Sequence, residues 1–366
     1  MTQNTMKLIN EIRLAKQIIL YGAHVYSYSL YIALKTHIDF NVVCFLVTDL
    51  QNNPDYIDGI KVIALSDLPD KQKTSLVVVA IPEPYHDDVV RSLIQYGCNS
   101  YLLVTSDIHS ELMNRYWMKN DPFYRRICDY RATEPSNDKK TMEIFVACNI
   151  NDKKLKTDNT LGENFHLIQS GSALTEERIA NLRDNTGDNI SIKNKYYSEV
   201  TVTYWLWKHS VADYVGLNHY RRILKLPENI LHVLSSYRID GILPVPVLVH
   251  PTALAHHAWY ISTDYWDCTM AVMKQIYPGC YDKAQAFFSN QRFYLHNIWI
   301  LSREHADAFC EWLFTILFEV EKRILLRQEI QTDRYMGYIA ENLSALYFCT
   351  QIEKLRIMHA DEIWLL

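Results

Sequence analysis

Several features that identify large classes of protein are missing from this sequence of 366 residues. There is no run of about 18–20 apolar residues, the length that a membrane-spanning helix needs, and the first residues have neither the basic start nor the apolar middle of a signal peptide. The eight cysteines are scattered and include no Cys-x-x-Cys pair, which excludes the common zinc and redox motifs. We therefore expect a soluble, cytoplasmic protein with reduced core thiols, and contact with the inner face of the membrane stays open.

An excess of positive charge is also missing, because 37 Lys and Arg face 42 Asp and Glu, for a formal net charge of -5. A long nucleic-acid interface needs a basic stripe that neutralises phosphates, so we expect no nucleic-acid partner. The chain is longer than the roughly 250–300 residues at which a single hydrophobic core stops growing, so we expect two domains. Aromatic residues are plentiful, with 25 Tyr and 8 Trp, and such rings fill cores or stack on sugars and bases.

The N-terminal third of the sequence alternates short apolar strands with helices. We expect strands at 17–21, 41–48, 76–81 and 101–104, and helices at 26–37 and 85–96. Near-continuous apolar strands that alternate with helices are typical of a parallel sheet covered on both faces. We therefore predict an α/β protein whose N-terminal Rossmann-like parallel sheet domain spans 1–108.

The segment 109–140 loses this alternation and carries a polar run, so we interpret it as a linker. A second α/β domain then spans 141–366. Its expected strands are 143–148, 214–217, 241–243 and 297–301, and its expected helices are 198–208, one that starts at 302 and one around 336–347.

The turn after the first strand decides whether the N-terminal domain can bind a dinucleotide. Such folds place G-x-G-x-x-G there, because glycine lets the backbone approach the pyrophosphate. The three positions here are Gly22, His24 and Ser27, and Asp49 ends the second strand, where a ribose-binding carboxylate is expected. Because a histidine ring would occupy the phosphate position, we expect no NAD and interpret this domain as a scaffold.

Three polar clusters crowd the second domain, at 184–191, 216–222 and 295–297. The second cluster follows an apolar strand and would deliver His219, Arg221 and Arg222 to the carboxyl end of the sheet, where open α/β proteins bind ligands. Planar guanidinium groups grip phosphate oxygens bidentately, so these residues suit a diphosphate leaving group. The alternative is that one arginine is a surface residue and the other pairs with a carboxylate.

The first cluster, DNTGDNIS, has the composition of a tight turn. Its polar side chains either form a loop and nothing more, or read a nucleobase edge and ribose hydroxyls. The sequence leaves both interpretations open.

These segments together resemble a family of bacterial capsular-polysaccharide and O-antigen glycosyltransferases, long classed as a domain of unknown function. The resemblance runs from about residue 143 to the end and rests on the ordered motifs DNTGDNIS, YYSEVTVTYWLWK, YVGLNHYRR, DGILPVP, YLHNIWIL, CEWLFTILFEVEKR and RYMGYIAENL. It implies a GT-A-like glycosyltransferase domain, a nucleotide-sugar donor such as a UDP-sugar, and an oligosaccharide or lipid-linked saccharide acceptor. Family members more often have cysteine where Asn218 stands and tyrosine or phenylalanine where Leu224 stands, which bears on acceptor specificity.

The resemblance and the clusters together give candidate roles to particular residues. The catalytic candidates are His219, Arg221 and Arg222, with Asp264 and His257 as candidate bases for the acceptor hydroxyl that an inverting reaction must deprotonate. The donor-binding candidates are Asp184, Asp188, Asn189, Lys193 and Asn297.

Most GT-A enzymes hold a divalent metal on an Asp-x-Asp triplet, and this sequence contains no such triplet. By the resemblance, Arg221 and Arg222 stand in its place, so we favour fixed protein charge over a metal. The alternative is a Mn or Mg site formed by His219, His296 and Asp240.

Two other functions stay open. The chain could be a nucleotide-dependent enzyme that modifies sugars through the N-terminal domain, or a non-catalytic protein of a polysaccharide-assembly complex. Formation of a homo-oligomer is a further open expectation.

Overall fold

The computed structural model describes residues 1–131, 140–152, 161–326 and 332–365. The chain forms two compact units. Unit 1 comprises Met1–Pro122 and Val247–Trp259, and unit 2 comprises Phe123–Pro246 and Tyr260–Leu366. Each unit is described by itself.

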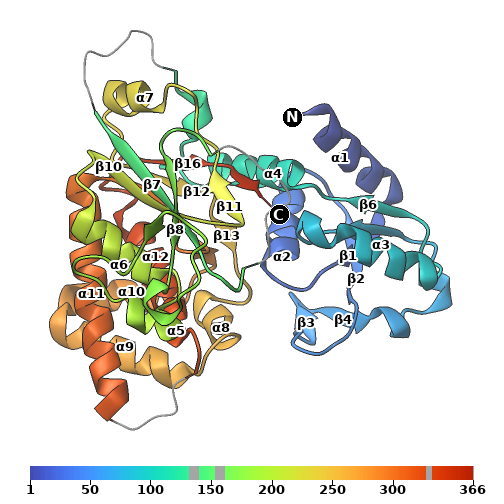
Figure 1. Ribbon diagram of the computed structural model, residues 1–366. Coiled ribbons are helices and arrows are strands. Elements are labelled where there is room, and N and C mark those ends of the chain that lie inside the picture. Colours follow the sequence, from blue (N-terminus) through green and yellow to red (C-terminus); the bar gives the residue numbers. More distant parts are fainter. Residues whose placement is uncertain (132–139, 153–160, 327–331, 366) are drawn as a thin grey trace. The chain divides into compact units, whose positions relative to one another are not determined.

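Unit 1 is built on a six-stranded sheet with the order β3-β4-β2-β1-β5-β6 (Figure 1). Every neighbouring pair is parallel except β3 and β4. The five parallel strands follow the strand order of the Rossmann fold. The strands are β1 (Gln17–Tyr21), β2 (Asn41–Val47), β3 (Tyr56–Ile57), β4 (Ile60–Ala64), β5 (Leu76–Val79) and β6 (Tyr101–Leu103).

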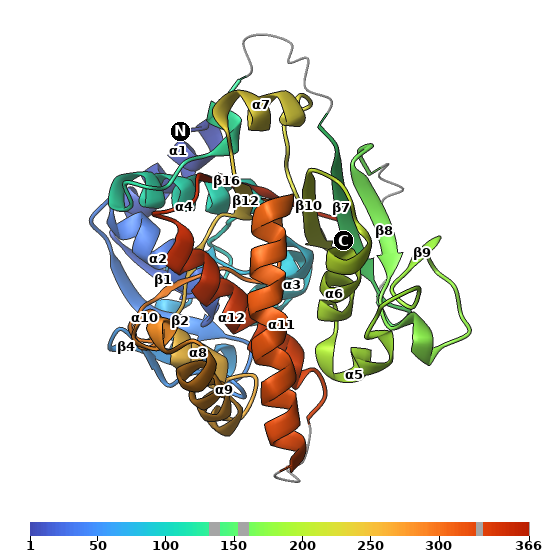
Figure 2. The same cartoon turned by 90° about the vertical axis from the view of Figure 1, so that its left-hand side faces the viewer.

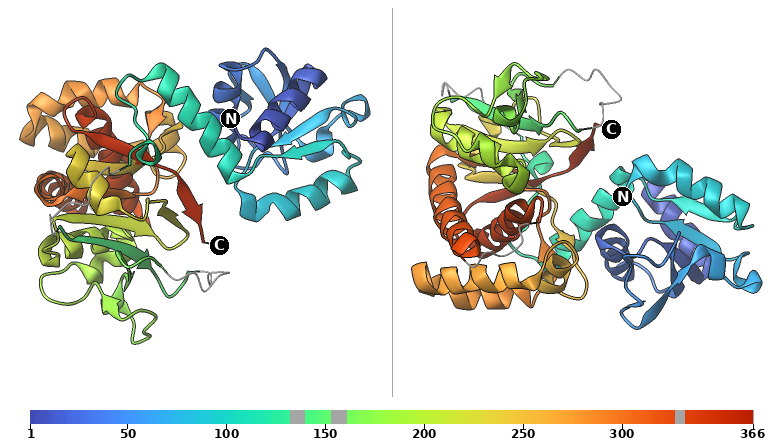
Figure 3. Two further views of the ribbon diagram at one scale, coloured as in Figure 1. Left: turned by 90° about the horizontal axis from the view of Figure 1, so that it is seen from above. Right: turned by 60° about the horizontal axis from the view of Figure 1, so that its bottom comes forward.

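Helices surround this sheet, as Figure 3 shows for the blue and teal part of the chain. They are α1 (Gln3–Ala15), α2 (Val25–Lys35), α3 (His86–Gln95) and α4 (Ser106–Asn120), and unit 1 also contains α8 (Ala253–Ala258). Successive strand residues point to opposite faces of a sheet, and Ile19 and Val77 pack on the same side as Val89 and Leu93 of α3. The apolar runs of the sequence thus become the two buried faces of a parallel sheet.

A segment distant in sequence completes unit 1. Residues 247–259 carry β13 (Val247–Leu248) and α8. The buried Ser29 hydroxyl of α2 donates to the Leu248 carbonyl at 3.1 Å and accepts from the Leu248 amide at 2.8 Å. The structure therefore divides the chain differently from our expected boundaries at 108 and 141, because unit 1 runs to Pro122, α4 ends at Asn120 inside the expected linker, and 247–259 joins unit 1.

Unit 2 is built on a larger mixed sheet with the order β16-β12-β15-β10-β7-β8-β9. Strand β15 runs antiparallel to both of its neighbours, whereas β10, β7, β8 and β9 are parallel. The short strand β11 pairs with β10 and β17. The strands of this sheet are β7 (Met142–Cys148), β8 (Phe165–Gln169), β9 (Leu182–Arg183), β10 (Tyr214–His219), β11 (Arg222–Leu224), β12 (Gly241–Pro244), β15 (Trp299–Ser302), β16 (Ile357–Ala360) and β17 (Glu362–Trp364). Unit 2 also contains the short strand β14 (Arg292–Phe293), which lies outside this sheet.

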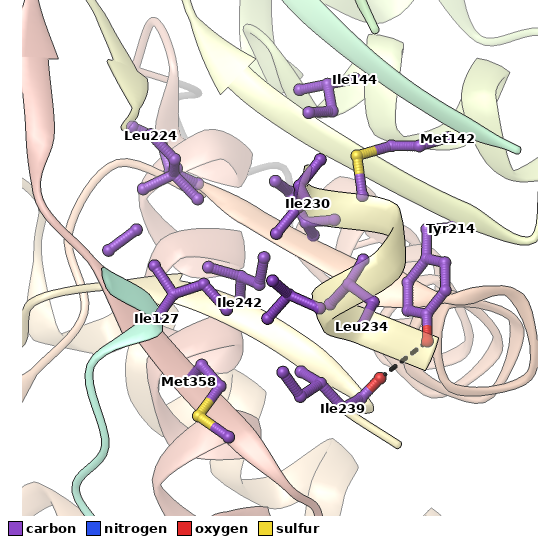
Figure 4. Close-up of a cluster of buried hydrophobic side chains, with 14 residues drawn as sticks. Ile127, Met142, Ile144, Tyr214, Leu224, Ile230, Leu234, Ile239, Ile242 and Met358 are labelled. Atoms are coloured by element: carbon purple, nitrogen blue, oxygen red, sulfur yellow. Dashed lines mark hydrogen bonds between the residues drawn. The ribbon is translucent and has the colours of Figure 1, made fainter. Parts of the chain in front are cut away.

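The helices of unit 2 include the long α11, which runs beside α12 and α6 in Figure 2. They are α5 (Asn194–Tyr197), α6 (Val200–His209), α7 (Ile230–Tyr237), α9 (Thr263–Ile276), α10 (Pro278–Phe288), α11 (Arg303–Leu326) and α12 (Tyr335–Gln351). A buried cluster between α7 and the sheet contains Ile144, Tyr214 and Ile242, and the Tyr214 hydroxyl donates to the Ile239 carbonyl at 2.9 Å (Figure 4).

The predicted α/β class with parallel sheets is confirmed, and most predicted strands and helices agree with the structure to within two residues. In the described part of the chain, no helix has the length and apolar character needed to cross a membrane.

Candidate functional site

A cleft of about 640 Å³ lies at the carboxyl ends of the adjacent parallel strands β10, β7 and β8 of unit 2. Parallel strands end at the same edge of a sheet, and ligands of open α/β folds bind there. Side chains reach the cleft from the segments that follow each strand and from the start of α12. The lining includes Asp152, Gly171, Lys195, Ser198, Glu199, His219, Arg221, Asp333 and Arg334.

The turn between β10 and β11 separates the two adjacent arginines. His219 pairs with Arg222 across this hairpin, so Tyr220 and Arg221 form its tip. Arg221 lines the cleft, and its Nε donates to the Tyr220 hydroxyl at 2.5 Å. The Arg221 amide also donates to Nδ1 of His219 at 3.3 Å.

Arg222 belongs to a different environment. Its guanidinium carbon lies 4.2 Å from the centre of the Trp364 ring, on the neighbouring strand β17. Burial raises the pKa of the Glu362 carboxyl on the same strand, and the charge of Arg222 opposes that shift. The structure therefore places Arg221, and not Arg222, in the cleft lining.

A second arginine enters the cleft from an unexpected part of the sequence. Arg334 precedes α12 with a left-handed φ of 65°. Its amide donates to the Lys195 carbonyl at 3.0 Å, and its Nε donates to the Ser198 hydroxyl at 3.0 Å. These two bonds hold Arg334 at the same cleft that Arg221 of the β10–β11 hairpin lines, more than 100 residues earlier in the chain.

Asp184 is fully buried beneath the loop that lines the cleft. Its carboxylate accepts from the amides of Gly171 and Ser172 at 2.8 and 3.0 Å. It also accepts from the hydroxyls of Ser191 and Thr201 at 2.5 and 2.6 Å. Asp184 is therefore not the nucleoside contact that the sequence predicts, and instead holds the loop after β8 against η6 (Ser191–Lys193) and α6.

The loop itself needs a glycine at position 171. Gly171 has a φ of 67°, and a Cβ atom there would lie 2.6 Å from the Asn194 side-chain oxygen. The glycine lets the chain turn closely over the start of α5, where the cleft begins.

Three other donor-binding candidates make local contacts outside the cleft lining. Asp188 accepts from the Tyr204 hydroxyl at 3.1 Å, and Asn189 bonds the backbone of Gly187 and Ser191. Lys193 forms an ion pair of 2.5 Å with Glu321 of α11. The DNTGDNIS segment is thus mainly a well-formed turn.

Asn297 reaches the cleft indirectly, through a residue that the sequence analysis did not select. Its side-chain amide donates to a Glu199 carboxylate oxygen at 2.8 Å, and its oxygen accepts from Ser344 of α12 at 3.1 Å. Glu199 lines the cleft. Burial raises the pKa of Glu199, although the hydrogen bond from Asn297 opposes the shift. Glu199 is the one acidic residue of the YYSEVTVTYWLWK motif. That carboxyl group, within a motif of the family, is the signal from which the sequence could have identified Glu199.

The backbone around Asn297 is unusual, because His296 and Asn297 are consecutive left-handed residues with φ values of 74° and 52°. Such conformations cost about 1–3 kcal/mol and cluster at functional sites. The His296 amide donates to Glu341 of α12. The turn thereby aims the Asn297 amide at Glu199.

Asp152 is a second cleft carboxylate that the sequence analysis missed. Burial raises its pKa, and hydrogen bonds from the Asn149 amide and the Tyr220 hydroxyl together with the charges of Arg221 and Arg334 oppose that shift. The Asn149 amide donates to it at 2.6 Å.

Of the three proposed metal ligands, Asp240 lies apart from His219 and its neighbour His296. Asp240 precedes β12, and its carbonyl accepts from Ser302, which pairs with Tyr214 at the start of β10. His219 ends β10, about 17 Å farther along at about 3.3 Å per residue. Asp240 instead accepts from the Arg356 amide at 2.8 Å and lies 3.5 Å from His305. In the described residues, no three His, Cys, Asp or Glu side chains are arranged to hold a metal.

His219 is itself ill suited to carry charge. Burial, reinforced by the positive charge of nearby His296 and the arginines, lowers the pKa of His219 well below its usual range. The imidazole is therefore neutral near pH 7 and acts as a hydrogen-bonding group.

The two candidate bases lie outside the cleft lining. Asp264 is exposed in the first turn of α9. His257 is buried in α8 of unit 1, and burial lowers its pKa to about 4. The sequence alone could not show that the segment carrying His257 leaves the second domain.

Asn218 and Leu224, the two positions that depart from the family pattern, contact each other and do not line the cleft. The Asn218 side-chain oxygen accepts from the Leu224 amide at 2.8 Å, and both residues are buried. They stabilise the hairpin that presents Arg221.

Comparison with known proteins bears on the fold and the family of this chain. No curated protein matches the sequence. The solved apo structure of the WbbM bifunctional glycosyltransferase has a similar fold, with a TM-score of 0.51 and 23% identity over 62% of this chain. The similar region spans 45% of the WbbM chain, less than half of its length. Residues 143–352 match the family described as Domain of unknown function (DUF4422), so this chain belongs to the DUF4422 family.

Proposed function

We propose that this chain is a glycosyltransferase that moves a hexose from a UDP-sugar to a saccharide acceptor in the synthesis of a bacterial surface polysaccharide. The acceptor is an oligosaccharide or a lipid-linked saccharide of a capsule or an O-antigen. The observation that carries the proposal is the cleft of unit 2, where two arginines, a lysine and three carboxylates meet at the carboxyl ends of parallel strands. The glycosyltransferase fold of WbbM supports it.

Arg221 and Arg334 supply the positive charge that a departing nucleoside diphosphate needs. Each guanidinium is fixed by a hydrogen bond from its own Nε, to Tyr220 and to Ser198 respectively. The remaining N–H groups of each arginine suit phosphate oxygens. Charge that is already in position costs no reorganisation when the glycosidic bond breaks.

Glu199 is the proposed base. In the transfer step, an acceptor hydroxyl oxygen forms the new bond to the anomeric carbon, and the bond from that carbon to the diphosphate oxygen breaks. The hydroxyl proton moves to Glu199, and the electron pair of the broken bond stays on the diphosphate. A carboxylate with a raised pKa is well matched to this task, and Asn297 orients it.

Asp184 and the Gly171 loop act as positioning residues. The buried carboxylate shapes the wall of the cleft without entering it. Because Asp240 lies apart from His219 and His296, the proposal assigns the leaving-group charge to the arginines and routes no step through a metal.

The proposal is tested by incubating the full chain with a panel of UDP-, GDP- and dTDP-sugars, with and without oligosaccharide acceptors, and measuring the nucleoside diphosphate released. We expect release from a UDP-sugar that accelerates with an acceptor. Arg221→Ala should lower the rate about 100-fold or more, the usual effect of removing one transition-state donor. Arg91→Ala is the matched control, because Arg91 is 73% exposed in unit 1 and pairs within its own helix with Asp88. Absence of release from every donor would contradict the proposal.

A further inference from the structure

We propose that unit 1 binds a single neutral sugar ring in a pocket at the carboxyl ends of β1 and β2. The aromatic pocket, as we call it, has a volume of about 200 Å³ and is lined by His24, Tyr28, Tyr56, His250, His256 and Trp259, among others. The proposal goes beyond sugar transfer in unit 2 and stands on observations in unit 1 alone.

The position of the aromatic pocket is that of a ligand site in this type of fold. His24 follows β1 at the start of α2, and Tyr56 follows β2 along the chain. The ligands of open parallel sheets bind outside the carboxyl ends of the strands. The remaining wall comes from 247–259, which joins unit 1 from a distant part of the sequence.

The walls of the pocket are held by specific contacts. Asp58 lies 3.2 Å from Nε2 of His250, and the His250 ring lies 4.8 Å from that of Tyr28. The rings of His24 and Trp259 meet edge to face at 5.6 Å. The buried pair of hydrogen bonds between Ser29 and Leu248 fastens the segment just before His250.

The chemistry of the lining selects a neutral ligand with hydroxyl groups. None of the described residues that line the pocket is Lys or Arg, so a diphosphate would find no fixed positive charge. Burial lowers the pKa of His24, which keeps that imidazole neutral near pH 7. Neutral imidazoles can donate to or accept from hydroxyl groups, and aromatic faces cover the apolar face of a sugar ring.

The size of the pocket and the exposure of its rim restrict the choice of ligand further. Pockets for drug-sized ligands span about 300–1,000 Å³, so a volume of about 200 Å³ suits one sugar ring and is too small for a dinucleotide. Trp259 and Tyr56 are 42% and 57% exposed, which leaves their rings accessible at the rim. A terminal or branching sugar of a glycan could therefore enter with the rest of the glycan outside.

The experiment is saturation-transfer NMR on the full chain with the methyl glycosides of glucose, galactose, mannose and N-acetylglucosamine. We expect at least one glycoside to bind, and Trp259→Ala to weaken its binding about tenfold or more. Tyr56→Ala provides a second variant that removes an exposed ring. Tyr85→Ala is the matched control, since Tyr85 is 51% exposed in unit 1 and does not line the pocket.

Arg221→Ala separates this proposal from sugar transfer in unit 2. We expect this variant to retain glycoside binding while it loses release of nucleoside diphosphate. The pocket proposal is overturned if no glycoside binds, if both pocket variants bind as the wild type does, or if binding is lost only in Arg221→Ala. Binding of NAD or UDP that is lost in Trp259→Ala would also overturn it, because the ligand would then be a nucleotide.

Discussion

The two units carry different side chains at the carboxyl ends of their parallel strands. In unit 1 the carboxyl ends of β1 and β2 are surrounded by imidazole and aromatic rings without a lining arginine or lysine among the described residues. In unit 2 the carboxyl ends of β10, β7 and β8 meet two arginines, a lysine and three carboxylates. The fold provides an opening in both cases, whereas the charge of the lining decides which ligand it suits.

Within unit 2, the two adjacent arginines at the end of β10 lie in different surroundings. The hairpin after β10 turns Arg221 toward the cleft and Arg222 toward Trp364. Arg334 then supplies the second guanidinium from the start of α12. The arginines that share the cleft are therefore Arg221 and Arg334, which only the tertiary structure brings together, and not the sequence neighbours Arg221 and Arg222.

The largest expected effect in unit 2 is that of Glu199→Gln. If Glu199 accepts the acceptor proton, its amide variant should lose about 10²–10⁴-fold in kcat, the usual contribution of a general base, while donor binding stays close to that of the wild type. The measurement is the rate of glycoside formation at saturating donor and acceptor. Glu176→Gln, at a fully exposed position, is the matched control. Normal turnover by Glu199→Gln would remove this residue from the mechanism.

The next largest effect distinguishes the neighbouring arginines. Arg221→Ala should lower kcat/KM about 10²–10³-fold, because a charge-assisted contact to the leaving group is lost. Arg222→Ala should lose less, since its guanidinium packs on Trp364. Steady-state kinetics of both variants, with melting curves to verify folding, measure the difference. Equal losses without a change in melting temperature would return Arg222 to the site.

A smaller effect concerns pH. Burial raises the pKa of Glu199, so its carboxylate takes up a proton at a higher pH than an ordinary glutamate does. A base must be unprotonated, and activity should therefore fall as the pH drops through this raised pKa. We expect the acidic limb of the kcat profile to lie above 4.5, the ordinary pKa of a glutamate, and to disappear in Glu199→Gln. An identical limb in the variant would assign it to another group.

The smallest expected effect is that of chelation. Fixed arginine charge at the leaving group predicts that activity survives excess EDTA, and that His219→Ala loses less than Arg221→Ala because the imidazole is neutral. The assay is donor turnover before and after removal of free metal. Activity that is abolished by EDTA and restored by manganese or magnesium would show that a metal shares this charge.

Local patterns predicted the elements of the fold better than their assembly. The strands at 17–21 and 143–148 and the helix from 302 follow from apolar runs and from spacing of three to four residues, and they agree closely with β1, β7 and α11. The same reasoning placed the candidate Arg221 at a strand end, where the structure has it.

The remaining features depend on contacts between residues far apart in sequence. The bond from Asn297 to Glu199 joins residues 98 positions apart, and Arg334 meets Ser198 across 136 positions. The segment 247–259 lies with unit 1 although the residues before and after it belong to unit 2. Neither periodicity nor turn chemistry contains this information, because both report only on near neighbours.

The central claim, that the nucleotide binds in unit 2 and not in unit 1, is tested most directly by calorimetric titration of UDP into the full chain. We predict saturable binding that Arg221→Ala weakens about tenfold or more, in line with about 1.5–3 kcal/mol for a hydrogen bond to a charged group, and that Trp259→Ala leaves unchanged. UDP binding that survives Arg221→Ala but is lost in Trp259→Ala would contradict the account, because it would place the nucleotide in the aromatic pocket of unit 1.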